Sequence, residues 1–131
     1  IDHFKAYNDH YGHQAGDYVL QRVGQLLAQA GRRPLDMAVR LGGEEFAVLL
    51  YDISLAEAQQ RAESLRAALE QLQIAHEAST TAAVVTLSVG VACLQPQPGG
   101  ALTQLYERAD RALYVAKGAG RNQVALACTA A

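Results

Sequence analysis

Residues 37–50 constrain the fold more than any other stretch, because two short apolar segments there flank four residues that favour a turn. Segments 37–41 and 46–50 carry the apolar, β-branched and aromatic side chains typical of strands. The residues between them are Gly42, Gly43, Glu44 and Glu45. A connection of this length joins antiparallel neighbours, so the sequence predicts a β-hairpin.

Helical patterns surround this hairpin. Three segments carry apolar side chains at the three- and four-residue spacing of amphipathic helices: 14–30, 54–72 and 102–116. Gly31 is expected to end the first helix. Ser54 is a candidate N-cap of the second, and Glu57 three residues later completes a capping box.

Two further strands complete the pattern. Residues 84–94 form a β-branched apolar run that predicts a buried strand, in which Gly90 marks a bulge or a close backbone approach. Residues 123–126 can form a last strand, and Ile1 is interpreted as the end of a strand whose earlier part is absent. The order (β)αββαβαβ predicts an α+β domain with helices packed on an antiparallel-rich central sheet.

Composition excludes several classes of function. A chain of 131 residues fits one domain, and its formal net charge of -2 argues against non-specific binding to DNA, RNA or an anionic membrane. No apolar run approaches the ~18 residues of a membrane span. Cys93 and Cys128 are expected to be reduced thiols of a cytoplasmic protein.

Several polar residues fall at the ends of the expected elements: Lys5, Asn8, His13, Asp17, Glu44, Glu45, Lys117 and Arg121. Paired carboxylates with nearby lysine and arginine suit a magnesium-bound nucleotide. Gly42 and Gly43 would let a phosphate approach the backbone without meeting a Cβ atom. An amide with a carboxylate, such as Asn8 with Asp17, can read the edge of guanine.

Ordinary structural roles account for each of these residues singly. A bare GGEE turn is more often solvated charge than a site. Lys117 and Arg121 could simply complement a helix C-terminus. Arg33 with Asp36 could form one exposed loop pair of small effect, and the four histidines show no metal-binding spacing.

Four stretches, taken together, resemble a known family. They are IDHFKAYNDHYGHQAGDYVL, RPLDMAVRLGGEEF, VTLSVGVA and RADRALYVAKGAGRNQV. In this order and at these separations they look like the GGDEF domain of diguanylate cyclases, which serve bacterial signalling. The resemblance covers essentially the whole chain and implies a ferredoxin-like or palm-like βαββαβ core, as in nucleotidyl cyclases. It also implies condensation of two GTP molecules into cyclic di-GMP with release of pyrophosphate.

The resemblance implies specific roles around the metal. Glu44 would bind Mg²⁺ (or Mn²⁺) and help to deprotonate the attacking 3′-hydroxyl, with Glu45 assisting. The backbone carbonyl of Ile1 would also face the metal, and Lys5 would steady charge on the transferring phosphate. These roles agree with phosphoryl transfer driven by positioning and charge neutralisation.

Further roles concern the nucleotide. By the same resemblance, Lys117 and Arg121 would hold the outer phosphates of GTP. Asn8 and Asp17 would read guanine, with His13 close to the base or ribose. Two such domains would meet face to face, each holding one GTP, so a homodimer or higher homo-oligomer is expected.

An inhibitory site is implied as well. Arg33 and Asp36 match the RxxD pattern at which the product, cyclic di-GMP, binds in this family. The family's second arginine aligns with Ser64 here, and Arg61 and Arg66 lie nearby in the sequence.

The family pattern also includes an acidic metal ligand just before Ile1, together with a preceding strand and helix. The chain is therefore expected to be a single GGDEF domain, 1–131, that lacks its N-terminal helix and most of the first strand. A longer natural protein with an N-terminal sensor or dimerising region is expected. The alternative function is a cyclic di-GMP receptor with little or no catalysis. A cyclase acting on ATP is disfavoured by Asn8 and Asp17.

Overall fold

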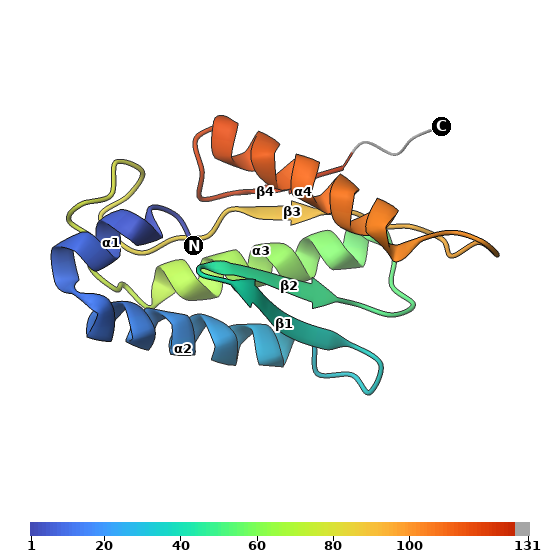
Figure 1. Cartoon of the computed structure of the whole chain (residues 1–131), viewed down its shortest axis with the longest axis horizontal. Helices are drawn as coiled ribbons and strands as arrows, with labels where there is room; N and C mark the ends of the chain where they lie inside the picture. Colours follow the sequence, from blue (N-terminus) through green and yellow to red (C-terminus); the bar gives the residue numbers. More distant parts are fainter. Residues whose placement is uncertain (128–131) are drawn as a thin grey trace.

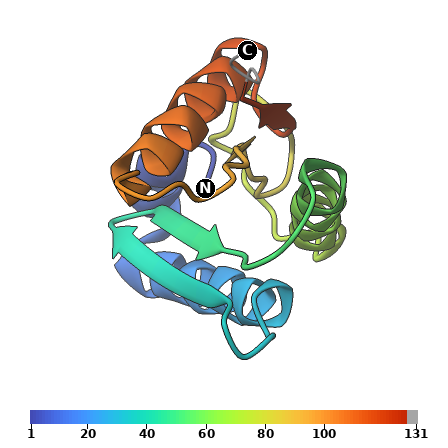
Figure 2. The same cartoon turned by 90° about the vertical axis from the view of Figure 1, so that its right-hand side faces the viewer.

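The computed structural model describes residues 1–127, so Cys128 lies outside the described part. Its elements, in chain order, are α1 (Phe4–Tyr11), α2 (His13–Ala30), β1 (Met37–Gly42), β2 (Glu45–Leu49), α3 (Leu55–Gln71), β3 (Val89–Val91), α4 (Leu102–Gly118) and β4 (Val124–Leu126). Figure 1 shows the β1–β2 hairpin between α2 and the α4–β3–β4 unit. The view along the long axis in Figure 2 shows the same order, with α3 to one side.

The expected hairpin is present. β1 pairs with β2 in antiparallel fashion, in a register that places Met37 opposite Leu49 and Gly42 opposite Glu45. The turn itself is therefore Gly43 with Glu44, which is tighter than the four-residue connection expected from the sequence. Gly43 has φ 52°, in the left-handed region that glycine adopts at little cost.

The expected strand over 84–94 is mostly wrong in extent. Only Val89–Val91 forms a ladder, and it pairs in parallel with β4. The preceding residues make backbone hydrogen bonds to another segment: Val85 N donates to Ile74 O at 2.8 Å, and Ala83 O accepts from His76 N at 2.9 Å. This segment therefore folds back on residues 74–76 and leaves only three residues for β4.

The start of the chain lies between the two sheets. The Ile1 nitrogen donates to the Glu44 carbonyl at 3.3 Å, and Asp2 N donates to the Thr86 carbonyl at 3.0 Å. Figure 1 shows the N-terminus beside the hairpin tip. The α+β class is confirmed, but the strands within residues 1–127 form two two-stranded sheets, one antiparallel and one parallel.

A short helix precedes the first expected one. α1 was not predicted, although Phe4, Tyr7 and Tyr11 have helical spacing and all pack in or against the main core. Gly12 separates α1 from α2 with φ 91° and ψ 162°, which no helix contains. The predicted helices over 14–30, 54–72 and 102–116 correspond to α2, α3 and α4.

Capping and packing hold these helices in place. Glu57 N donates to Ser54 Oγ at 3.1 Å, which confirms the predicted N-cap of α3. α3 and α4 each contact β3 and β4, while α2 contacts β1 and α3. The larger core cluster joins α1, α2, α3 and residues 85–87. None of the helices within residues 1–127 combines the length and the apolar character that crossing a membrane requires.

Gly90 confirms the predicted close approach. A Cβ atom at this position would lie 2.2 Å from the Ala109 carbonyl oxygen and 2.3 Å from Leu113 N, both on the backbone of α4. Any side chain at position 90 would therefore push α4 away from β3.

We predict that Gly90→Ala lowers the free energy of unfolding by about 1–3 kcal/mol, because the α4 backbone cannot move without repacking. The matched control is Gly24→Ala in α2, where an added Cβ meets nothing within 4 Å. This control should raise stability by up to about 1 kcal/mol through helix propensity. Urea unfolding measures both, and equal stability of Gly90→Ala and the unsubstituted protein would contradict the packing described.

Candidate functional site

The hairpin tip, the start of the chain and the end of α4 meet at one place. The Ile1 nitrogen donates to the Glu44 carbonyl at 3.3 Å. The charges of Lys117, Glu44 and Glu45 also act electrostatically on this position. Two carboxylates from the hairpin and one lysine from α4 therefore lie within electrostatic reach of the Ile1 backbone.

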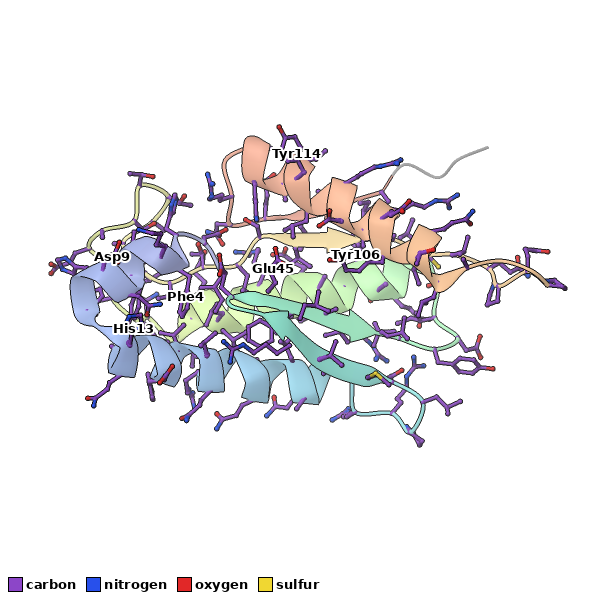
Figure 3. All side chains as sticks on the ribbon, viewed as in Figure 1. Phe4, Asp9, His13, Glu45, Tyr106 and Tyr114 are labelled. Atoms are coloured by element: carbon purple, nitrogen blue, oxygen red, sulfur yellow. The ribbon has the colours of Figure 1, made fainter. Side chains whose placement is uncertain are left out.

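The two glutamates are exposed at this tip. Glu44 occupies the turn and Glu45 begins β2, where Figure 3 labels it. Carboxylate and carbonyl oxygens are hard donors, and Mg²⁺ or Mn²⁺ binds through one or two carboxylates together with water and substrate phosphates. Within residues 1–127, no three His, Cys, Asp or Glu side chains gather as a metal cluster. Glu44 and Glu45 are two exposed carboxylates, a donor set that would suit a cation to which a phosphate also contributes ligands.

Lys117 and Arg121 flank a tight turn after α4. Both are basic residues at the helix end; Arg121 has φ 63° and Asn122 has φ 48°, both left-handed. Arg121 N donates to the Ala116 carbonyl at 3.0 Å, which closes the turn. Burial lowers the pKa of His3, and the charge of Arg121 acts in the same direction, so Arg121 lies within electrostatic range of His3.

Asp2 is an important residue that the sequence interpretation missed. Its side chain is buried and accepts hydrogen bonds from Thr86 Oγ1 at 2.8 Å, from Ser88 Oγ and from Asn122 N at 3.0 Å. The partners lie 84 to 120 residues away in the sequence. No local pattern reveals such partners; the only signal was a charged residue beside an apolar chain start.

The residues predicted to read guanine lie at the α1–α2 junction. Asn8 Oδ1 is buried without a hydrogen-bond partner, and a Cβ atom on Gly16 would lie 1.7 Å from it. His13 begins α2, Asp17 follows Gly16, and both are exposed. Figure 3 labels His13 beside α1 at this end of the molecule. The Asn8 residue as a whole is half-buried, and a side-chain amide offers both donors and an acceptor to a polar ring edge.

Lys5 lies nearby on α1 in an exposed ion pair. Its Nζ atom is 3.0 Å from Asp9 Oδ2, four residues along the helix. Exposed pairs of this kind contribute little to stability, so an anionic ligand could displace Asp9 at small cost.

Arg33 and Asp36 form a closed pair instead of an open loop. Arg33 Nε donates to Asp36 Oδ2 at 2.9 Å and Arg33 Nη2 donates to Oδ1 at 3.0 Å, while Tyr51 N donates to Oδ1 at 3.1 Å. The Asp36 side chain has no exposed surface. The hydrogen bonds from Arg33 lower the pKa of Asp36 to about 2, despite the opposing effect of burial.

Only one of the two nearby arginines joins this pair. Arg61 Nη1 lies 3.6 Å from Asp36 Oδ2 and also donates to the Ala30 carbonyl at 3.3 Å. Ser64 and Arg61 line a groove of about 520 Å³ between α2 and α3. Arg66 was expected near this site but lies elsewhere: its Nη1 atom donates to Asn122 Oδ1 at 2.8 Å. Helical geometry explains the difference, because positions five apart on α3 point in different directions.

Comparison with known proteins identifies the family of the chain. Residues 1–123 match the family model described as "Diguanylate cyclase, GGDEF domain". This match spans most of the chain, and the chain therefore belongs to the GGDEF domain family of diguanylate cyclases.

Similar sequences carry corresponding names. The chain is 40% identical over 124 residues to the probable diguanylate cyclase DgcT of Escherichia coli, covering 95% of this chain and 27% of that protein. It is 41% identical over 126 residues to diguanylate cyclase A of Treponema denticola, covering 96% of this chain and 33% of that protein. The chain thus spans about a third or less of the length of these relatives.

Solved structures show the same fold. The GGDEF domain of DgcB from Caulobacter crescentus, in complex with c-di-GMP, matches with a TM-score of 0.82 and 34% identity, over 96% of this chain and 72% of that one. The active GGEEF domain of a diguanylate cyclase from Vibrio cholerae matches with a TM-score of 0.79 and 32% identity, over 99% of this chain and 80% of that one.

We predict that Arg33→Gln raises the pKa of Asp36 from about 2 toward its ordinary 3.8, because the hydrogen bonds that stabilise the carboxylate are lost. In the unsubstituted protein the folded state holds this pKa below the unfolded value. The resulting stabilisation is present above about pH 3.8 and is lost as the pH falls through about 2. Carboxyl-detected NMR titration measures the shift. Arg32→Gln, an exposed neighbour with the same charge change, should leave Asp36 unchanged.

Proposed function

We propose that this chain is the catalytic domain of a diguanylate cyclase, which condenses two GTP molecules into cyclic di-GMP and releases two pyrophosphates. The main support for this proposal is that Glu44, Glu45 and Lys117 lie around the Ile1 backbone. The chain's family and the names of its relatives support the same activity. We infer this activity from the proposed site and not from the fold, because one fold supports many functions.

Each nucleotidyl transfer needs a base and a charged clamp. The 3′-hydroxyl of one GTP attacks the α-phosphorus of the other, a P–O bond forms, and the bond to pyrophosphate breaks. Glu44 accepts or relays the hydroxyl proton, and Lys117 with Arg121 balances the charge of the departing pyrophosphate. Lys5, held only by Asp9, is free to move toward the transferring phosphate.

Mg²⁺ or Mn²⁺ at this site would polarise the phosphate oxygens and lower the pKa of the attacking hydroxyl. Glu44, Glu45 and the Ile1 carbonyl are the groups that would hold the ion. Gly42 at the end of β1 and Gly43 in the turn leave space for the phosphates, since a Cβ atom on either glycine would meet nothing within 4 Å.

Guanine recognition is assigned to the α1–α2 junction. Asn8 presents a half-buried amide, and Asp17 presents an exposed carboxylate one residue after Gly16. The carboxylate can accept from the guanine ring N–H and amino group, a pattern that adenine does not offer. His13, at the start of α2, would lie toward the base or ribose.

The proposal includes two copies of the domain, because each holds one GTP and the reaction joins two. A cytoplasmic location completes the proposal, since GTP is available there and Cys93 is a free, exposed thiol.

Product binding at Arg33 and Asp36 is a second proposed property. The DgcB domain, 34% identical, was solved in complex with c-di-GMP. Here Arg33 is partly exposed and Arg61 lines the adjoining groove, so two guanidinium groups can meet guanine edges or phosphates. If catalysis is absent, this site supports the alternative function of a cyclic di-GMP receptor.

The first test of catalysis is product formation. We predict that the purified protein converts GTP into cyclic di-GMP with Mg²⁺ or Mn²⁺, measured by chromatography. Glu44→Gln should lower the rate by about 100-fold or more, because loss of a metal-binding carboxylate removes several kcal/mol of transition-state stabilisation. Glu107→Gln, an exposed glutamate of α4, is the matched control and should keep the activity. Product formation that Glu44→Gln leaves unchanged would disprove the assigned site.

Calorimetry tests the inhibitory site separately. We predict that Arg33→Ala weakens cyclic di-GMP binding by about tenfold or more, because one charge-assisted contact is lost. Arg22→Ala on α2, far along the helix from this pair, should bind as the unsubstituted protein does. If Arg33→Ala and Arg22→Ala bind the product equally well, the assignment of the inhibitory site is wrong.

A further inference from the structure

A buried hydrogen-bond network joins the start of the chain to the turn after α4. The Asp2 carboxylate is 3% exposed and accepts from Thr86, Ser88 and the backbone N–H of Asn122. Since a carboxylate only accepts hydrogen bonds, three donors directed at one buried group define its position closely. The Asn122 backbone is thereby tied to Asp2.

The Asn122 side chain extends the network to α3. Its Oδ1 atom accepts from Arg66 Nη1 at 2.8 Å, and its Nδ2 atom donates to Glu70 Oε2. Arg66 in turn contacts Glu70 at 3.2 Å and makes further bonds to Glu63. Both the oxygen and the nitrogen of the Asn122 side-chain amide therefore make hydrogen bonds. The Asn122 backbone has a left-handed conformation, with φ 48°.

Two residues of this network are sequence neighbours of residues in the proposed nucleotide site. Asp2 immediately follows Ile1, whose carbonyl is one of the groups proposed to hold the metal. Asn122 immediately follows Arg121, which is proposed to hold outer phosphates. The hydrogen bond of 3.0 Å from Asn122 N to Asp2 Oδ2 therefore links the residue after Ile1 to the residue after Arg121. It connects the proposed metal side of the site to the proposed phosphate side.

We propose that Asp2 and Asn122 are positioning residues that hold the Ile1 carbonyl and the Arg121 side chain in register for a metal-bound GTP. This inference rests on the proposed nucleotide site. Asp2 acts through both neighbours, whereas the Asn122 side chain acts through the Arg121 turn alone. Phosphoryl transfer depends on such placement, because misplacement of about 1 Å costs about 100-fold in rate.

The test compares two conservative variants. Asp2→Asn keeps the shape but places an NH₂ group where a carboxylate oxygen accepts. Asn122→Gly keeps the left-handed backbone and the N–H to Asp2 but removes the bonds to Arg66 and Glu70. Val23→Ala, a buried α2 position that is 1% exposed, is the control for lost stability alone.

Binding of a non-hydrolysable GTP analogue is measured by calorimetry, at several Mg²⁺ concentrations and with each protein fully folded by circular dichroism. Asp2→Asn should weaken analogue binding by about tenfold and raise the half-saturating Mg²⁺ concentration. Asn122→Gly should weaken analogue binding while leaving the Mg²⁺ dependence unchanged. Val23→Ala should change neither quantity, although it lowers the urea midpoint.

The outcomes separate this inference from the proposed function. If Asp2→Asn and Asn122→Gly bind the analogue as Val23→Ala does, the network is only structural and the inference fails. If the variants weaken binding but the unsubstituted protein makes no cyclic di-GMP, the proposed catalysis fails and the positioning role stands. If the unsubstituted protein does not bind the analogue, both are overturned.

Discussion

The buried Asp2 carboxylate is the interaction on which the arrangement of the site depends. It gathers donors from residues 86–88 and 122, so three segments that lie more than thirty positions apart in the chain meet at this group. A buried carboxylate without these donors would be costly, so the three segments are stable together or not at all. Since Ile1 precedes Asp2 and Arg121 precedes Asn122, the same cooperative unit places groups from both ends of the chain at one site.

The hairpin supplies the opposite side of this site. Its tip carries two exposed carboxylates, which repel each other unless a cation or nearby basic groups compensate them. Lys117 and both hairpin glutamates lie within electrostatic range of Ile1. The tip is thus a place where negative charge accumulates beside a basic helix end. That combination is useful for a metal-bound polyphosphate and has no evident value for packing.

Local patterns identified most of the elements but not their long-range pairing. The hairpin, the Ser54 cap and the close approach at Gly90 followed from glycine, capping and periodicity rules that act within a few residues. α1 was missed because its eight residues are polar on most of their surface. The 84–94 strand was overextended because a β-branched run does not specify which backbone it will pair with.

The site residues show the same division. Glu44, Glu45 and Lys117 were found as charged residues at element ends, and the structure brings them to one place. Asp2 and Asn122 were missed because their meaning comes from hydrogen bonds across 120 positions. Arg66 was assigned to the wrong cluster because sequence proximity to Arg61 does not specify which face of α3 a side chain occupies.

The Arg33–Asp36 pair has a consequence for any ligand at that place. Asp36 is fully covered and already accepts from Arg33, Tyr51 N and the Arg33 backbone N–H. A guanine that bonded to this carboxylate would have to displace one of these donors and expose a buried charge, which is costly. Recognition through the exposed parts of Arg33 and Arg61 requires no such exchange. The carboxylate therefore serves first to hold the Arg33 fork in place, and the arginines are the groups available to a ligand.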